Sequence, residues 1–228
     1  MSPERATTST GRPRLLDLFC GAGGATKGYQ QAGFCVIGVD IKPQRNYCGD
    51  DFIQADALEV LAEGVTGIDA IHASPPCQRY SAMSTCRPGL SDDYPDLVAP
   101  VRDLLDQTGL PYVIENVPGS PLVNPTTLCG TMFGHELYRH RLFEANFDLP
   151  EPEHPEHVMP ASKAGHWRPG TVMSVAGHFA PVAHGRVVMD IDWMNREEMA
   201  EAIPPYYTEH VGRHMLAALV EQQEEAAA

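Results

Sequence analysis

The sequence lacks the features that would assign it to several common protein classes. Its six cysteines include no C-x-x-C pair and no histidine neighbours at zinc-finger spacing. A disulfide framework is not expected in a chain of this size without a secretion signal. No apolar run reaches the length of a membrane span, and residues 1–13 have no signal-peptide core. We therefore expect reduced thiols, no membrane partner and a cytoplasmic protein.

An excess of basic charge is also missing. The 16 Lys and Arg face 30 Asp and Glu, for a formal net charge of −14, and phosphate binding depends on Lys and Arg. The imbalance is uneven: from residue 191 onward eight acids face two bases, whereas residues 139–190 hold five bases, six acids and six histidines. The charge argues against a nucleic-acid partner without excluding one, because residues 139–190 could present a local basic face.

What the chain does contain is a series of short apolar runs separated by helical patterns. The runs that predict strands are 14–19, 35–40, 51–56, 69–74 and 111–117, and helices are expected over 26–34, 57–63 and 95–108. This alternation predicts an α/β fold with a doubly wound, mostly parallel sheet. In such sheets ligands bind beyond the carboxyl ends of the strands.

The length of 228 residues suits one domain with a small appendage. We expect a disordered N-terminus at 1–13, a catalytic and cofactor-binding core at 14–147, and a small irregular insert at 148–190. Residues 191–228 are predicted to form C-terminal helices that pack back on the core. No internal repeat is visible, and the expected state is a monomer.

A glycine-rich turn follows the first predicted strand in "DLFCGAGG". Glycines there let the backbone approach a ligand and direct helix N-terminal amides at it, although many such turns are plain tight connections. Asp40, about twenty residues on, suits a ribose diol, and Asp56 could accept from an adenine amino group. The Lys-Ser/Thr of a phosphate loop is missing. An adenosine-containing cofactor without a long phosphate chain is therefore expected.

A cysteine in a rigid setting follows the fourth predicted strand in "HASPPCQRYS". The two prolines restrict the backbone before Cys77 and hold its sulfur in one position. A buried structural cysteine does not need that rigidity, whereas a nucleophile does. Cys77 is therefore the predicted nucleophile, and the other cysteines are predicted to be mostly core residues.

Four motifs together resemble the cytosine carbon-5 DNA methyltransferases. "DLFCGAGG", "SPPCQRYS", "ENV" and "RHRLFE" occur in the order of that family, and P-P-C-Q followed about forty residues later by E-N-V is its most specific pair. The resemblance spans residues 14–145, resumes weakly at "NREEMAEAIP", and fits a short member of bacterial or phage type. It implies an S-adenosylmethionine-dependent, Rossmann-like methyltransferase fold.

The resemblance also implies a mechanism and a catalytic set. Cys77 would add to carbon 6 of cytosine in DNA before a methyl group from S-adenosylmethionine reaches carbon 5. Glu115 would hydrogen-bond the base at its amino group and ring nitrogen 3, and Asn116 would orient the loop. Arg141 would reach the base carbonyl, and Arg139 would help hold the site.

The remaining site residues follow from the same resemblance. The cofactor-binding residues it implies are Phe19, Gly21, Ala22, Gly23, Gly24, Asp40, Ile41, Asp56, Ala57, Pro76 and Thr208. Thr208 stands in for a family G-N-S/A-V segment that is not visible. The expected nucleic-acid contacts are Gln78, Ser81 and Arg87. Within the insert, the residue types themselves favour Lys163, Trp167, Arg168 and Arg186 as further contacts, and a surface position of no special role is the alternative for these four. The loop from Ser81 to Asp93 would close over a flipped cytosine.

The sequence departs from the family pattern in three respects. Leu137 replaces a glutamine, His140 replaces the acid between the arginines, and the recognition insert is unusually short. The insert histidines 154, 157, 166, 178 and 184 have irregular spacing with no cysteine among them, so no metal site is expected.

These departures leave other functions open. The same chemistry on RNA, on a free cytosine nucleotide or with another alkyl donor is one alternative, and a catalytically silent DNA-binding homologue is another. The target site and a restriction endonuclease partner also stay open.

Overall fold

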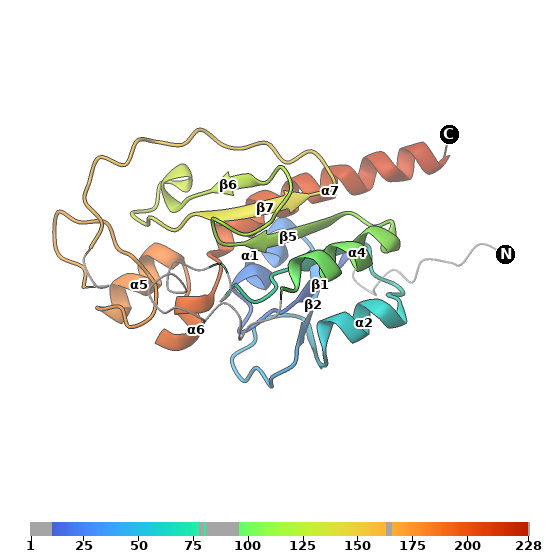
Figure 1. Cartoon of the computed structure of the whole chain (residues 1–228), viewed down its shortest axis with the longest axis horizontal. Helices are drawn as coiled ribbons and strands as arrows, with labels where there is room; N and C mark the ends of the chain where they lie inside the picture. The colour runs from blue at the N-terminus through green and yellow to red at the C-terminus, as the bar shows by residue number, and fades with distance from the viewer. Residues whose placement is uncertain (1–10, 78–79, 81–95, 163–165, 228) are drawn as a thin grey trace.

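The computed structural model describes residues 11–77, 80, 96–162 and 166–227 (Figure 1). Over these residues a single sheet runs through the molecule, and helices lie along it. None of the helices in the described ranges combines the length and apolar character that crossing a membrane requires. The five cysteines within these ranges are free thiols, and Cys86 lies outside them.

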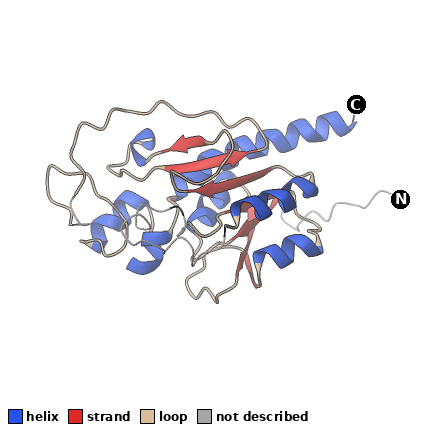
Figure 2. Cartoon of the chain, in the orientation of Figure 1, coloured by secondary structure: helices blue, strands red, loops and turns tan. Residues whose placement is uncertain are grey.

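The central sheet has seven strands in the order β3-β2-β1-β4-β5-β7-β6. Figure 2 shows the strands in red and the helices in blue. The strands are β1 Arg14–Leu18, β2 Cys35–Asp40, β3 Asp51–Gln54, β4 Ala70–Ala73, β5 Tyr112–Asn116, β6 Thr126–Leu128 and β7 Arg141–Ala145. β1 to β5 are parallel, and β7 runs antiparallel to both β5 and β6. The predicted α/β class and mostly parallel sheet are confirmed.

Helices cover both faces of the sheet because successive strand residues point to opposite sides. On one face Leu15, Val36 and Val113 pack with residues of α1 (Gly24–Ala32) and α7 (Pro205–Ala227). On the other, Leu16 and Ile37 pack with residues of α2 (Ala57–Glu63) and α4 (Val98–Thr108). The two apolar layers make the fold doubly wound, as the alternation of runs predicts.

The sequence patterns missed the last two strands of the sheet, β6 and β7. β6 has only three residues, and β7 carries the polar residues Arg141 and Glu144 within an otherwise apolar run. Glu144 is buried because Arg102 of α4 pairs with it, with an Nε–Oε1 distance of 2.5 Å. A buried ion pair of this kind hides a strand from hydrophobic pattern analysis.

The insert is also more regular than expected. Residues 148–190 are predicted to be irregular, and this is wrong for α5 (Val182–Met189), which precedes α6 (Arg196–Glu201). Gly185 in the middle of α5 weakens the helical pattern. An added Cβ at Gly185 would lie 2.4 Å from the Phe179 ring, so close packing accounts for the glycine.

The strand register brings the carboxyl ends of five strands to one edge. Leu18 of β1, Val39 of β2, Ala73 of β4 and Ile114 of β5 are neighbours across successive strand pairs. The residues that follow them therefore emerge side by side, and antiparallel β7 begins at the same edge with Arg141. Strand order reverses between β1 and β4, the position where such sheets bind ligands. The residues that end or follow these strands therefore lie along one edge of the sheet.

Candidate active site

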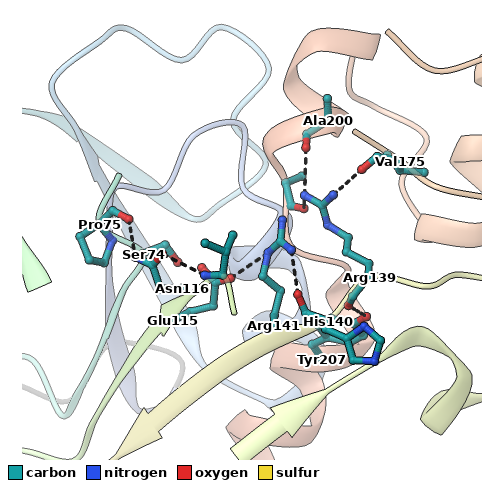
Figure 3. Close-up of polar contacts among 12 residues, drawn as sticks. Ser74, Pro75, Glu115, Asn116, Arg139, His140, Arg141, Val175, Ala200 and Tyr207 are labelled. Carbon is teal, nitrogen blue, oxygen red and sulfur yellow. Dashed lines mark hydrogen bonds and ion pairs between the residues drawn. The ribbon is translucent and has the colours of Figure 1, made fainter. Parts of the chain in front are cut away.

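Cys77 lies in a loop that is fixed to the neighbouring strand. The loop follows β4, and the side chain of Asn116 at the end of β5 donates from Nδ2 to the Pro75 carbonyl at 3.0 Å (Figure 3). The Asn116 Oδ1 accepts from the backbone N–H of Val117 at 2.9 Å. Both ends of this buried amide are therefore used, and the amide joins the proline–proline–cysteine loop to β5.

Glu115 is a buried carboxylate beside a cation. Its side chain lies 3.1 Å from Arg141, measured from Oε1 to Nε, and only 6% of the residue is exposed. The contact is ionic rather than a well-directed hydrogen bond, because Oε1 has no hydrogen-bond partner among the described residues. Arg141 donates from Nη1 to the His140 carbonyl at 2.8 Å, which fixes its orientation. An outside donor could therefore satisfy Oε1.

Burial raises the pKa of both Glu115 and Cys77. Burial raises the pKa of Glu115, whereas Arg141, Arg139 and a hydrogen bond from Ser74 lower it by less. The pKa of the Cys77 thiol is raised by burial and then by Glu115, against the effect of Arg141 and Arg139. Glu115 and both arginines thus act electrostatically on Cys77, and Glu115 holds a proton to higher pH than an exposed carboxyl.

Arg139 is buried and points away from Glu115 (Figure 3). Its guanidinium donates to the carbonyls of Ala200 and Ala202 at 2.9 and 2.8 Å and to that of Val175. Its own carbonyl accepts from the Tyr207 hydroxyl at 2.5 Å. Arg139 therefore supports the site by joining the chain before β7 to the C-terminal segments.

Sequence reasoning missed a chain of hydrogen bonds behind Glu115. The Tyr29 hydroxyl contacts Nδ1 of His72 at 2.9 Å, and Nε2 of His72 contacts the Ser74 hydroxyl at 2.7 Å. Burial lowers the pKa of His72 to about 3, so the ring is neutral. Since Ser74 donates to Glu115, Nε2 carries the proton and Nδ1 accepts from Tyr29. A histidine within an apolar strand was the available signal.

The turn after β1 has a geometry that requires glycine. Gly23 has φ 87°, and an added Cβ would lie 2.8 Å from the Cys48 sulfur. The backbone N–H of Gly21 donates to Oδ2 of Asp40 at 3.1 Å, and that of Lys42 donates to Oδ1 at 2.9 Å. Asp40 thus holds the end of β2 against the glycine turn. Ala22 and Gly24 are buried in this turn.

Exposed apolar surface adjoins this turn. Phe19 has φ 61° and a partly buried ring, and Ile41 is 64% exposed directly after Asp40. Pro76 is exposed next to Cys77. These side chains lie at the edge where β1, β2 and β4 end, so a flat apolar group could lie against them.

Two residues predicted to bind the cofactor, Asp56 and Thr208, make structural contacts within the fold. Asp56 is the N-cap of α2, where its Oδ1 accepts from Leu58 at 2.8 Å, and the adjacent Ala57 is buried. Thr208 is fully buried and donates to the Ala25 carbonyl at 2.8 Å. Thr208 therefore fastens α7 to α1.

The predicted nucleic-acid contacts are only partly described. Gln78, Ser81, Arg87 and Lys163 lie outside the described residues. Arg168 is exposed in the insert, and Arg186 is exposed on α5, where it donates to the Met194 carbonyl at 3.3 Å.

Comparisons with known proteins agree with these motifs. A family model described as C-5 cytosine-specific DNA methylase matches residues 13–127. The Type II methyltransferase M.FnuDI of Fusobacterium nucleatum is 32% identical over 114 residues, which cover 46% of this chain and 33% of that protein. The chain thus spans a third of the length of this curated relative.

Solved structures show the same fold at low identity. The S. pombe Dnmt2 methyltransferase has a TM-score of 0.61 at 13% identity, covering 91% of this chain and 99% of that one. An E. coli prophage protein described as a DNA modification methyltransferase has a TM-score of 0.62 at 14% identity, covering 92% and 99%.

Proposed function

The chain belongs to the C-5 cytosine-specific DNA methylase family, and on that premise we propose that it transfers a methyl group from S-adenosylmethionine to carbon 5 of cytosine in DNA. The observation that carries the proposal is the buried Glu115 carboxylate, paired with Arg141 and with Oε1 free of hydrogen bonds among the described residues. A cytosine ring edge offers the donors and acceptors that this pair could bind. The same two residues act electrostatically on Cys77.

The proposed reaction forms and then breaks a bond to Cys77. The thiolate adds to carbon 6 while a hydrogen bond from protonated Glu115 at ring nitrogen 3 draws electron density from the ring. S-adenosylmethionine, when bound, supplies an electrophilic methyl group. Carbon 5 would take that methyl with the electron pair of the former double bond, and the donor would leave as S-adenosylhomocysteine. Loss of the carbon 5 proton then restores the double bond and expels the Cys77 thiolate.

The cofactor would lie on the turn after β1. Its adenine would pack against Phe19 and Ile41, and its ribose hydroxyls would reach Asp40, since all three residues lie at that edge. The amides of Gly21, Gly23 and Gly24 would face its methionine part. Asp56, although it caps α2, keeps a second carboxylate oxygen that could accept from the adenine amino group.

Asp40→Ala is expected to weaken S-adenosylmethionine binding by about 1–3 kcal/mol, the usual range for a lost hydrogen bond to a charged group. Titration calorimetry measures the change. Asp103→Ala is the matched control, because Asp103 is an exposed acid on α4, away from the strand edge. Equal affinity in Asp40→Ala and Asp103→Ala would contradict the cofactor assignment.

DNA is the proposed substrate despite the net charge of −14. A flipped cytosine is needed because duplex stacking hides carbon 6 from a thiol. Expression in a host without cytosine methylation, followed by base-resolution sequencing of its DNA, tests the proposal. Methylated cytosines in a short degenerate context are expected, because a small insert reaches few base edges. If DNA stays unmethylated while RNA or a free nucleotide gains the methyl group, the assignment of DNA as the substrate is wrong.

The insert is proposed to contribute to DNA recognition. Arg168→Ala or Arg186→Ala is expected to weaken DNA binding and to reduce the salt slope by about one unit for each lost phosphate contact. Fluorescence anisotropy over a range of salt concentrations measures both, and cofactor affinity should stay unchanged. Arg213→Ala on α7, outside the insert, is the control. Unchanged DNA affinity in both insert variants would mean that residues outside the insert recognise DNA.

A further inference from the structure

The structure brings four metal-ligating side chains together at one end of the β6–β7 pair. They are Cys129, His140, His154 and His157, and their ligand atoms all lie within 4.8 Å of one another. Sequence spacing predicted no metal site because no cysteine lies among the insert histidines. The fold overturns that argument, since Cys129 comes from the end of β6, 25 residues before His154.

We propose that Cys129, His140, His154 and His157 bind one zinc ion as a closed structural site. Thiolate and imidazole are the ligands that zinc prefers, and four protein ligands in a tetrahedron are typical of structural zinc. Magnesium and calcium, which prefer oxygen ligands, do not suit this set. The site is separate from Cys77 and Glu115, and the proposal does not rest on the methyl-transfer reaction.

Two of the six distances between ligand atoms agree with a tetrahedral zinc ion, and all six are within 4.8 Å. Zinc bond lengths of about 2.3 Å to sulfur and about 2.05 Å to nitrogen place a sulfur and a nitrogen about 3.6 Å apart, and two nitrogens about 3.3 Å apart. The Cys129 sulfur lies 3.5 Å from Nε2 of His157. Nε2 of His140 lies 3.2 Å from Nε2 of His154. Both contacts match the expected separations between ligands of one ion.

Neighbouring groups hold the ligands in place. The Tyr138 ring stacks on His157 with centroids 3.7 Å apart, and the Thr131 hydroxyl donates to the Cys129 sulfur at 3.4 Å. Outer contacts of this kind orient metal ligands.

The ion would join three segments that are separate in the sequence. Cys129 directly follows β6, His140 directly precedes β7, and His154 and His157 lie in the loop after β7. Residues 153–161 are exposed throughout and form no helix. A metal ion would anchor this loop and hold His140, whose carbonyl orients Arg141.

The test measures zinc in the untagged full chain, purified without chelator, by inductively coupled plasma mass spectrometry. One zinc per chain is expected, falling to near zero in His154→Ala and in His157→Ala. Both histidines are exposed, so these variants should fold, and circular dichroism checks that they do. His166→Ala, an exposed insert histidine outside the cluster, should keep its zinc.

Cobalt substitution tests the ligand set itself. The chelated chain titrated with Co²⁺ should show a thiolate-to-cobalt absorption band in the near ultraviolet and the intense visible bands of tetrahedral cobalt. Cys129→Ser should lose the thiolate band. Zinc-free wild type that also fails to bind Co²⁺ would overturn the proposal. Equal zinc in all variants, or a cobalt spectrum without the thiolate band, would do the same.

Discussion

Cys77→Ser is expected to abolish both methyl transfer and covalent trapping on DNA that contains 5-fluorocytosine. Fluorine at carbon 5 cannot leave as a proton does, so elimination stalls after methyl transfer and the wild-type adduct persists. A serine hydroxyl is a far poorer nucleophile than a thiolate at neutral pH. Loss of a covalent nucleophile reduces turnover on the order of 10⁴- to 10⁶-fold in other enzymes. A denaturing gel detects the trapped complex as a shifted band.

The other described cysteines provide the control for this experiment. Cys35→Ser changes a partly buried thiol on β2, on the far side of β1 from β4, and should leave trapping intact. A shifted band that is still present with Cys77→Ser would show that Cys77 is not the nucleophile. If the wild type is trapped on RNA and not on DNA, the proposed role of Cys77 stands but the substrate is RNA.

Glu115→Gln is expected to reduce kcat by about 10²- to 10⁴-fold, the range for removal of a general acid. The amide is close in shape to the carboxyl but cannot transfer a proton to the ring. Single-turnover kinetics with saturating DNA and cofactor measure the loss in the chemical step. Glu59→Gln, at an exposed acid in the first turn of α2, is the matched control and should react as wild type does. Wild-type turnover in Glu115→Gln would remove the proposed role.

The pH dependence separates Glu115 from a merely structural acid. Burial raises the pKa of Glu115 and of Cys77, and the reaction needs a protonated carboxyl with a deprotonated thiol. The active form of the enzyme therefore carries one proton in total on Glu115 and Cys77. Wild-type kcat/KM should be bell-shaped, because it rises through the carboxyl pKa and falls through the thiol pKa. In Glu115→Gln only the thiol titrates, so kcat/KM should rise through its pKa and then level off. A bell that survives in Glu115→Gln would mean that another group supplies the proton.

The sequence predicted the fold where local pattern and packing agree. β1, β2, β4 and β5 lie within the predicted runs because strands buried on both faces read as continuous apolar stretches. β3 also lies within a predicted run, although it is a largely exposed edge strand. β7 was not predicted because its Glu144 is buried in an ion pair with Arg102, which lies 42 residues earlier in the sequence. α5 was not predicted because Gly185, which has low helix propensity, is required there by close packing against the Phe179 ring. Each miss depends on a tertiary contact that periodicity does not contain.

The candidate site divides in the same way. The positions of Cys77, Glu115 and Asn116 could be predicted because each lies in a recognisable motif near the carboxyl end of a predicted strand. The hydrogen-bond chain from Tyr29 through His72 to Ser74 could not, because Tyr29 lies 43 residues from His72 in the sequence. Thr208 was placed by motif position, whereas its contact with Ala25 spans 183 residues. Cys129 joined the histidines only in the folded chain.

The three carbonyls bound by Arg139 have a consequence for the length of the insert. Arg139 donates to the carbonyls of Val175, seven residues before α5, of Ala200 in the last turn of α6, and of Ala202 just after α6. The chain therefore returns to a side chain that lies two residues before β7. The stretch between β7 and Val175 is therefore a loop with both ends fixed. The entropy cost of closing a flexible loop grows only logarithmically, by about 0.6 kcal/mol for each doubling of its length. Longer or foreign sequences could be grafted between those ends at little cost to the stability of the catalytic core.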